Sequence, residues 1–156
     1  MVLIAHNIRS LHNVGSLFRS AEVFGVECLY LTGYTGTPPR KEIAKTALGS
    51  ELRLLWKQAN DITYLITELK NKGYYIVGLE NAEHSRSLFE FMSESHSSKP
   101  IALVLGSEVD GIDSSVSVLC DVLVEIPMPG TKRSLNVSVA AGVALFAFRY
   151  HVIPAK

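Results

Sequence analysis

Neither sign of charge is in excess in this sequence of 156 residues. Fifteen Lys and Arg residues balance fifteen Asp and Glu residues, so the net charge at pH 7 is zero. This balance excludes a generally basic coat for binding nucleic acid, although a local basic patch is compatible with it. Only 19% of the residues are charged whereas 47% are apolar. That composition excludes intrinsic disorder, which needs low hydrophobicity and high net charge.

Cysteines and long apolar runs are also scarce. Cys28 and Cys120 lie far apart inside apolar stretches, so neither a disulfide framework nor a structural zinc site is expected, and a reducing compartment fits. The apolar run near the N-terminus is too short for a signal peptide. The longest uncharged apolar stretch, residues 139–148, is roughly half as long as a membrane-spanning helix. We therefore expect a cytoplasmic protein without a membrane segment.

Short apolar runs alternate with helical patterns along the whole chain. The runs predict strands at residues 2–5, 28–32, 74–79, 101–105 and 122–126. The helical patterns predict helices at residues 14–25, 40–48, 61–72, 88–92, 114–119 and 137–150, whereas residues 52–56 fit either a strand or a helical turn. Strands separated by helices need crossover connections. We expect one α/β domain over residues 1–156, with a mainly parallel sheet and helices on both faces.

Ligands of such sheets bind beyond the carboxyl ends of the strands. Three unusual polar segments, residues 6–13, 106–113 and 127–136, follow predicted strands at that edge. The first leads to Asn13, Gly15, Arg19 and Glu22. Asn13 can simply cap a helix that carries an exposed Arg19–Glu22 pair. Alternatively, a phosphate or ribose can approach Arg19 beside the bare backbone of Gly15. This segment by itself favours the simpler interpretation.

The second and third segments are more distinctive. LGSEVDG, residues 105–111, is neither a P-loop nor a GxGxxG motif, so a dinucleotide site is not expected. Its Glu108 either accepts hydrogen bonds from loop amides or faces the pocket. IPMPGTKRSLNVSVAAG, residues 126–142, contains a loop longer than most strand-to-helix connections. Ser134 or Asn136 is expected to cap the helix that follows.

Together these segments resemble the three motifs of the SpoU (TrmH-like) RNA 2'-O-ribose methyltransferases of the SPOUT superfamily. The order and spacing agree from about residue 2 to residue 150. The matching residues are Asn13, Gly15, Arg19, Leu103, Val104, Leu105, Gly106, Ser107, Glu108, Gly111, Ile126, Pro127, Met128, Gly130, Ser134, Leu135, Asn136, Val137 and Ser138. Val109 and Asp110 depart from the pattern, and the separate RNA-binding domain of many relatives is absent. The resemblance implies a C-terminal trefoil knot, which topology rules alone would not predict.

The resemblance also implies a reaction, the transfer of a methyl group from S-adenosylmethionine to an RNA ribose 2'-hydroxyl. The cofactor-binding residues would be Leu105, Gly106, Ile126, Pro127, Met128, Ser134, Leu135 and Asn136. Arg19 would be the catalytic residue, surrounded by Asn13, Glu108, Ser134 and Asn136. A guanidinium is a poor base because it stays protonated. We therefore expect Arg19 to bind the adjacent phosphate and to stabilise the developing alkoxide, with Glu108 and Asn136 orienting Arg19 and the ribose.

Basic residues are expected to face the RNA. They are Arg9, Arg19, Arg40, Lys41, Lys132 and Arg133, whereas the glutamate-rich residues 80–94 would point away. The predicted final helix has no charge from residue 137 to residue 148 and must be buried on all sides. A homodimer through this helix is expected, as in the family, with a central helix of a monomer as the alternative.

Several alternatives remain open at this point. The favoured substrate is tRNA, because we expect no separate RNA-binding domain, but rRNA is also compatible. A non-catalytic RNA-binding or assembly module, or a phosphate-binding enzyme unrelated to methylation, would also fit parts of the pattern. No metal is expected, because the histidines at positions 6, 12, 84, 96 and 151 lack ligand spacing. His6 and His12 are expected to be surface residues of loops.

Overall fold

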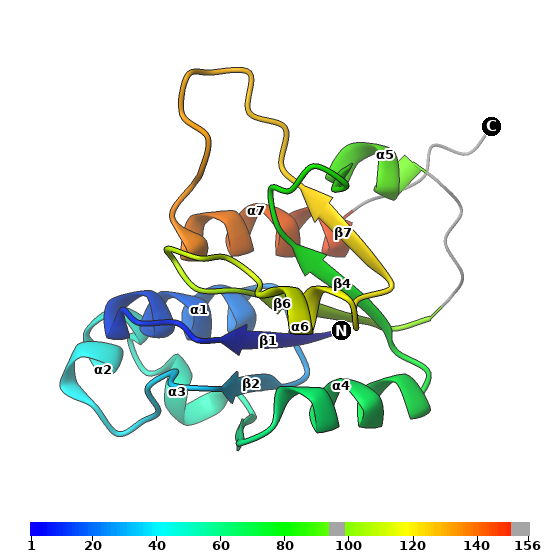
Figure 1. The fold of residues 1–156 in the computed structure, drawn as a ribbon. Coiled ribbons are helices and arrows are strands. Elements are labelled where there is room, and N and C mark those ends of the chain that lie inside the picture. Colours follow the sequence, from blue (N-terminus) through cyan, green and yellow to red (C-terminus); the bar gives the residue numbers. More distant parts are fainter. Residues whose placement is uncertain (94–98, 151–156) are drawn as a thin grey trace.

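The computed structural model describes residues 1–93 and 99–150, which form a three-layer α/β arrangement. Seven strands make one sheet in the order β3-β2-β1-β6-β4-β7-β5, and each neighbouring pair runs parallel. Their bounds are β1 Val2–His6, β2 Leu29–Thr32, β3 Trp56–Ala59, β4 Tyr75–Leu79, β5 Arg86–Ser87, β6 Ile101–Leu105 and β7 Val122–Glu125. Figure 1 shows the helices on both sides of this sheet. The α/β fold class is confirmed.

The described residues form seven helices, of which the first six lie between strands and the last follows β7. They are α1 Leu11–Val23, α2 Lys41–Ala47, α3 Ser50–Arg53, α4 Ile62–Asn71, α5 Leu88–Ser93, α6 Ser114–Ser117 and α7 Val137–Tyr150. The final helix has the predicted bounds, and Asp61 caps α4 as expected, accepting hydrogen bonds from the backbone N–H groups of Thr63 and Tyr64. The sequence did not predict β5, which has two residues, or the separation of α3 from β3. Residues 52–56 span the end of α3 and the start of β3, so they are neither one strand nor one turn.

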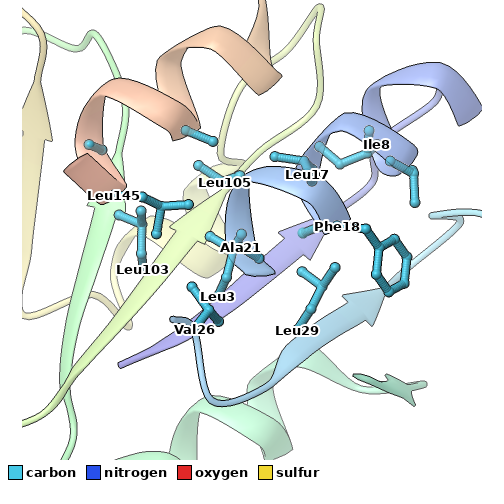
Figure 2. Packing of buried hydrophobic residues seen from close by; sticks show 14 of the residues in the cluster. Leu3, Ile8, Leu17, Phe18, Ala21, Val26, Leu29, Leu103, Leu105 and Leu145 are labelled. Carbon is cyan, nitrogen blue, oxygen red and sulfur yellow. The ribbon is translucent and has the colours of Figure 1, made fainter. Parts of the chain in front are cut away.

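Each face of the sheet has its own hydrophobic core because successive strand residues point to opposite sides. In β1, Leu3 and Ala5 face the core formed with α1 and α7, whereas Val2 and Ile4 face the core formed with α4 and α6. Figure 2 shows the larger core, in which side chains of β1, β2, β6, α1 and α7 meet. The central strands are therefore covered on both faces, as their continuous apolar sequences indicate.

Gly15 allows α1 and α2 to pack closely. A Cβ atom at this position would lie 2.1 Å from Thr46 Oγ1 and 2.3 Å from the carbonyl oxygen of Ile43. Gly15 is thus buried against α2, and the interpretation that a phosphate or ribose approaches Arg19 at Gly15 is wrong. The small residue serves helix packing.

The apolar final helix is only half buried in the single chain. Ala141, Ala144 and Leu145 face the core. Val139, Val143, Phe146 and Tyr150 are exposed, and their spacing places them along one side of the helix. We call these four residues the α7 stripe. The expectation that the helix is buried on all sides is therefore not met within one chain.

Two further expectations concern the membrane and the knot. No helix of the described residues is long and apolar enough to cross a bilayer. The threading that would make a trefoil knot stays a prediction of the resemblance.

Candidate functional site

A cleft of about 270 Å³ lies at the carboxyl edge of the sheet. Its walls come from three loops, which follow β4, β6 and β7. Because β4 lies between β6 and β7 in the sheet, the loops after β6 and β7 leave on either side of it. The cleft is lined by Leu79, Glu80, Asn81, Leu105, Gly106, Ser107, Glu108, Val109, Gly111, Glu125, Ile126, Met128, Arg133, Ser134, Leu135, Asn136, Val137 and Ala140.

Glu108 joins this cleft to the start of α1. Its Oε2 accepts a hydrogen bond from the backbone N–H of Arg9, and its Oε1 accepts one from that of Ser10, each at 2.9 Å. Oε1 also accepts one from Asn13 Nδ2 at 2.9 Å. Burial raises the pKa of the Glu108 carboxyl, but these donors outweigh that effect and leave the pKa below its ordinary value. Glu108 therefore does both things that the sequence left open: it binds loop amides and lines the cleft.

Asn13 continues the network toward the third loop. Its Oδ1 accepts a hydrogen bond from Asn136 Nδ2 at 3.0 Å. Asn136 Oδ1 in turn accepts bonds from the backbone N–H and the hydroxyl of Ser138, at 2.9 and 2.7 Å. Asn136 is thus the residue that caps α7, one of the two predicted candidates. The Glu108–Asn13–Asn136 network holds the three motif segments together.

Glu80 and Asn81 directly follow β4 and line the cleft, and sequence reasoning missed both. Glu80 Oε2 accepts a hydrogen bond from the backbone N–H of Ile112 at 2.6 Å, and Asn81 Nδ2 donates to the carbonyl oxygen of Arg133 at 2.9 Å. Gly111 has a φ of 67°, a backbone conformation that favours glycine, and a Cβ atom there would also displace the Glu80 carboxylate. The available signal was their position directly after a predicted strand.

The acidic segment does not point away as a whole. Glu80 lines the cleft, so the expectation that residues 80–94 all face away from the site is wrong for this residue. Glu94 lies outside the described residues.

Comparison with known proteins gives the family. The model of the SpoU rRNA methylase family matches residues 1–146. The chain belongs to this family. The 23S rRNA (guanosine-2'-O-)-methyltransferase RlmB of Xylella fastidiosa is 36% identical over 147 residues, covering 94% of this SpoU chain and 57% of the relative. The chain thus spans little more than half the length of the curated relatives it matches.

Solved structures resemble this SpoU chain over most of its length. An AdoMet-bound rRNA methyltransferase from Sinorhizobium meliloti superposes with a TM-score of 0.87 at 26% identity, covering 97% of this chain and 56% of that one. A chain from a study of the 2-OH methylation of C/U34 on tRNA superposes with a TM-score of 0.80 at 25% identity. That comparison covers 94% of this chain and 93% of the other.

The predicted cofactor-binding residues of the SpoU chain line the cleft except for Pro127, and the predicted catalytic residue Arg19 does not line it. Of the residues expected to bind cofactor, Leu105, Gly106, Ile126, Met128, Ser134, Leu135 and Asn136 line it. Pro127 is instead exposed and borders a second, open hollow lined by the loop after β7. Arg19 is exposed on α1 and is not among the described residues that line the cleft. Glu108 and Asn136 bond to Asn13, and the expectation that they orient Arg19 has no support in these contacts.

Two local expectations about α1 are wrong. Ser10, rather than Asn13, is the N-cap of α1, and its side chain accepts the backbone N–H of Asn13 at 3.3 Å. Glu22 does not pair with Arg19: its carboxylate accepts hydrogen bonds from Ser50 Oγ and Arg53 Nε, each at 2.5 Å. These bonds, that from Arg53 first, lower the pKa of Glu22 to about 2. The cap is a local contact three residues apart, whereas the pairing of Glu22 follows from contact with a distant segment.

The residues expected to bind RNA are all exposed. Arg9 precedes α1, Arg40 and Lys41 begin α2, and Lys132 and Arg133 lie in the loop after β7. Arg133 also lines the cleft. Arg19 lies within α1, whereas the other five lie on loops at the carboxyl edge of the sheet or at the helix starts that follow them.

His6 is buried, so the expectation of a surface histidine is wrong for it, whereas His12 is exposed as expected. His6 Nδ1 lies 2.8 Å from Thr32 Oγ1, and Asn7 Nδ2 lies 3.0 Å from His6 Nε2. Burial lowers the pKa of His6, although Asp113, whose Oδ2 lies 3.4 Å from Nε2, acts in the opposite direction. Within the described part of the chain, no three His, Cys, Asp or Glu side chains are grouped as metal ligands. His96 and His151 lie outside that part.

Proposed function

We propose that this chain is an RNA 2'-O-ribose methyltransferase that uses S-adenosylmethionine, with tRNA as its favoured substrate. The observation that carries the proposal is the Glu108–Asn13–Asn136 network at the mouth of the cleft. It joins residues from three separate motifs of the family into one arrangement. A preorganised polar arrangement beside a cleft is what positions two reactants for transfer.

The chemistry of the cleft suits S-adenosylmethionine. Two acidic side chains, Glu80 and Glu125, match its sulfonium and ammonium charges, and Arg133 matches its carboxylate. Apolar side chains such as Leu105, Ile126 and Leu135 offer the surface that an adenine needs. When bound, the cofactor supplies an electrophilic methyl group.

The chain's own side chains would then hold the ribose and stabilise the negative charge that develops on its 2'-oxygen. We assign Arg19 to the phosphate next to the target ribose, where a planar cation also stabilises the alkoxide that develops as the 2'-hydroxyl passes its proton to that phosphate or to water. Asn13 and Glu108 are fully engaged with each other and with the start of α1, so we assign them to positioning. Ser134 and Asn136 lie at the cleft, and we assign them to the cofactor side of the reaction.

A homodimer explains how Arg19 takes part although it lies outside the cleft of its own chain. The α7 stripe is an exposed apolar surface, and Phe24 extends it through ring contacts with Phe146 and Tyr150 at 6.2 and 6.5 Å. Burying such a stripe against a second copy is favourable because it removes apolar surface from water. Arg19 projects from α1, the helix that packs beside α7. We therefore propose that Arg19 of one subunit serves the cleft of its partner.

The preference for tRNA is supported by one structural comparison. The chain from the study of C/U34 methylation on tRNA matches over 93% of its own length. A domain of this size is therefore compatible with a tRNA substrate. The RlmB relative makes rRNA the alternative.

Transfer of labelled methyl from S-adenosylmethionine to unmodified total tRNA and, separately, to rRNA tests the proposal. After alkaline digestion, label in an alkali-resistant dinucleotide is expected, because a methylated 2'-oxygen cannot attack its own phosphate. Arg19→Ala is the matched control and should still bind the cofactor in calorimetry. A wild-type chain that neither binds S-adenosylmethionine nor labels either RNA would overturn the proposal.

A further inference from the structure

Tyr34 is an exposed aromatic residue in the loop between β2 and α2, at the edge of the sheet where the cleft opens. Its side chain is 55% exposed. The other exposed aromatic residues of the described ranges lie on helices: Tyr64 on α4, Phe89 on α5, and Phe146 and Tyr150 on α7. One exposed aromatic residue is ordinary on a protein surface. The backbone around Tyr34, however, is held in an unusual way.

The backbone on both sides of the Tyr34 ring is anchored to the loop between β1 and α1. Its own N–H donates a hydrogen bond to Asn7 Oδ1 at 3.2 Å. The next residue, Thr35, is buried, and its hydroxyl donates to the carbonyl oxygen of Ala5 and accepts from the N–H of Ile8, at 3.0 and 2.9 Å. The ring therefore leaves a fixed backbone while remaining in water.

Asn7 and Gly33 make this anchoring specific. Both have positive φ angles, 58° and 63°, and a Cβ atom on Gly33 would lie 1.9 Å from Asn7 Oδ1. A non-glycine residue at positive φ is uncommon and persists when its surroundings hold it. Here His6 holds it, because Asn7 Nδ2 donates to His6 Nε2 at 3.0 Å.

The same loop connects Tyr34 to the cleft. Arg9 follows Ile8, and its backbone N–H donates to Glu108, which lines the cleft. In the sheet, β1 separates β2 from β6, so the loops after those strands begin two strand spacings apart, about 10 Å. A nucleotide next to the one in the cleft can span this distance and contact the loop after β2.

The charges around Tyr34 fit a nucleic acid strand. Arg9 is exposed on the loop to which Tyr34 is bonded, and Arg40 is exposed at the end of Tyr34's own loop. The Arg40 side chain also runs beside Gly36, with its Cδ 4.0 Å from where a Cβ atom of that glycine would lie. An exposed aromatic side chain on loops that also carry exposed arginines suits unpaired RNA, whose bases stack on aromatic rings while its phosphates bind cations.

We propose that Tyr34 is a platform on which an unpaired base next to the methylated nucleotide stacks, with Arg9 and Arg40 binding the flanking phosphates. This inference rests on the proposed function, because it assumes that the target ribose enters the cleft. It further restricts the substrate to RNA in which the neighbour of the target is unpaired, as in a loop or bulge.

The test compares Tyr34→Ala, Tyr34→Phe and the control Tyr64→Ala, whose tyrosine is 65% exposed on α4. Competition binding with unmodified total tRNA and with rRNA gives the affinity, and methyl transfer gives the KM for RNA. Loss of one stacked base should weaken binding by Tyr34→Ala about 5- to 150-fold. Tyr34→Phe and Tyr64→Ala should bind as the wild type does, and the affinity for S-adenosylmethionine should be unchanged in all three.

The outcomes separate the two proposals. If the wild type methylates RNA and Tyr34→Ala binds it equally well, the stacking proposal fails alone. A Tyr34→Phe variant as weak as Tyr34→Ala would also overturn it, because the hydroxyl rather than the ring face would then matter. A wild type that neither binds the cofactor nor methylates RNA refutes the proposed function itself. Ultraviolet cross-linking of the RNA to Tyr34 is the independent positive result.

Discussion

The side-chain amides of Asn13 and Asn136 are hydrogen-bonded to each other, with Asn136 Nδ2 3.0 Å from Asn13 Oδ1. Asn13 is the third residue of α1 and Asn136 directly precedes α7, so this one bond joins two segments 123 positions apart in the sequence. Asn13 is also bonded to Glu108. The bond therefore fixes the mouth of the cleft from both sides.

Replacing Asn136 by Asp separates its two tasks. An aspartate still caps α7 through its carboxylate oxygens, but it cannot donate to Asn13 Oδ1. We expect the urea midpoint of unfolding to stay close to that of the wild type, while methyl transfer falls by about tenfold or more. Asn136→Ala, which also loses the cap, should lower both. Full activity of Asn136→Asp would contradict the positioning role of this bond.

Replacing Arg19 by Lys tests what the guanidinium contributes. A lysine keeps one positive charge but loses the planar fork that binds a phosphate through two hydrogen bonds. We expect kcat to fall by about tenfold or more with the KM for S-adenosylmethionine unchanged. Near-normal turnover would mean that a point charge suffices at this position.

Two helical glycines should respond to alanine with opposite signs. Gly15→Ala forces a Cβ atom against Thr46 and the backbone of Ile43, and we expect a loss of about 1–3 kcal/mol in the free energy of unfolding. In α7, the nearest atom to a Cβ on Gly142 would be Ser20 Oγ at 3.9 Å. Gly142→Ala should therefore gain about 1 kcal/mol from helix propensity. Urea denaturation measures both, and a stabilising Gly15→Ala would contradict the close packing of α1 on α2.

Stability should fall below neutral pH because of His6. Burial lowers the pKa of His6 in the folded chain below the ordinary value of 6.5, so in this range the unfolded chain binds more protons. The free energy of unfolding should be level above that value and should decrease as the pH falls through 6.5 toward the folded pKa. The groups that face His6 are Thr32, Asn7 and Asp113.

The measurement is urea denaturation between pH 7 and pH 5. His6→Gln should flatten the decrease, and His84→Gln, at an exposed loop position, is the control that should keep it. The same slope in wild type and His6→Gln would assign the decrease to other groups.

A charge on the α7 stripe should separate the subunits. Phe146 is 56% exposed, so Phe146→Glu is expected to fold and to halve the mass measured by light scattering.

Mixing two inactive dimers, Arg19→Ala and Glu108→Gln, tests whether the site is shared between subunits. Random exchange of subunits should restore about a quarter of the wild-type activity if Arg19 serves the partner's cleft. Mixed dimers without activity would place Arg19 in its own subunit's site.

Much of this protein is determined by sequence patterns that act locally. Continuous apolar runs mark the central strands, because strands covered on both faces need apolar residues at every position. Asp61 and Asn136 mark helix starts because their side chains bond to nearby amides. The three motif segments can likewise be recognised from the sequence, because the residues of each motif lie close together along the chain. For these features the sequence alone predicts fold class and site location.

Other features are decided by contacts between segments far apart in the chain. The local sequence suggests that a phosphate or ribose can approach Arg19 beside Gly15, but α2 packs against this glycine in the structure. Glu22 resembles a partner for Arg19 but binds Ser50 and Arg53.

The cleft and the final helix depend on tertiary structure in the same way. Glu80 enters the site because β4 lies between β6 and β7. The α7 stripe becomes visible only when the core covers the other side of the helix. In each case local spacing gives a residue its neighbours along the chain, whereas the sheet order determines which distant groups it meets.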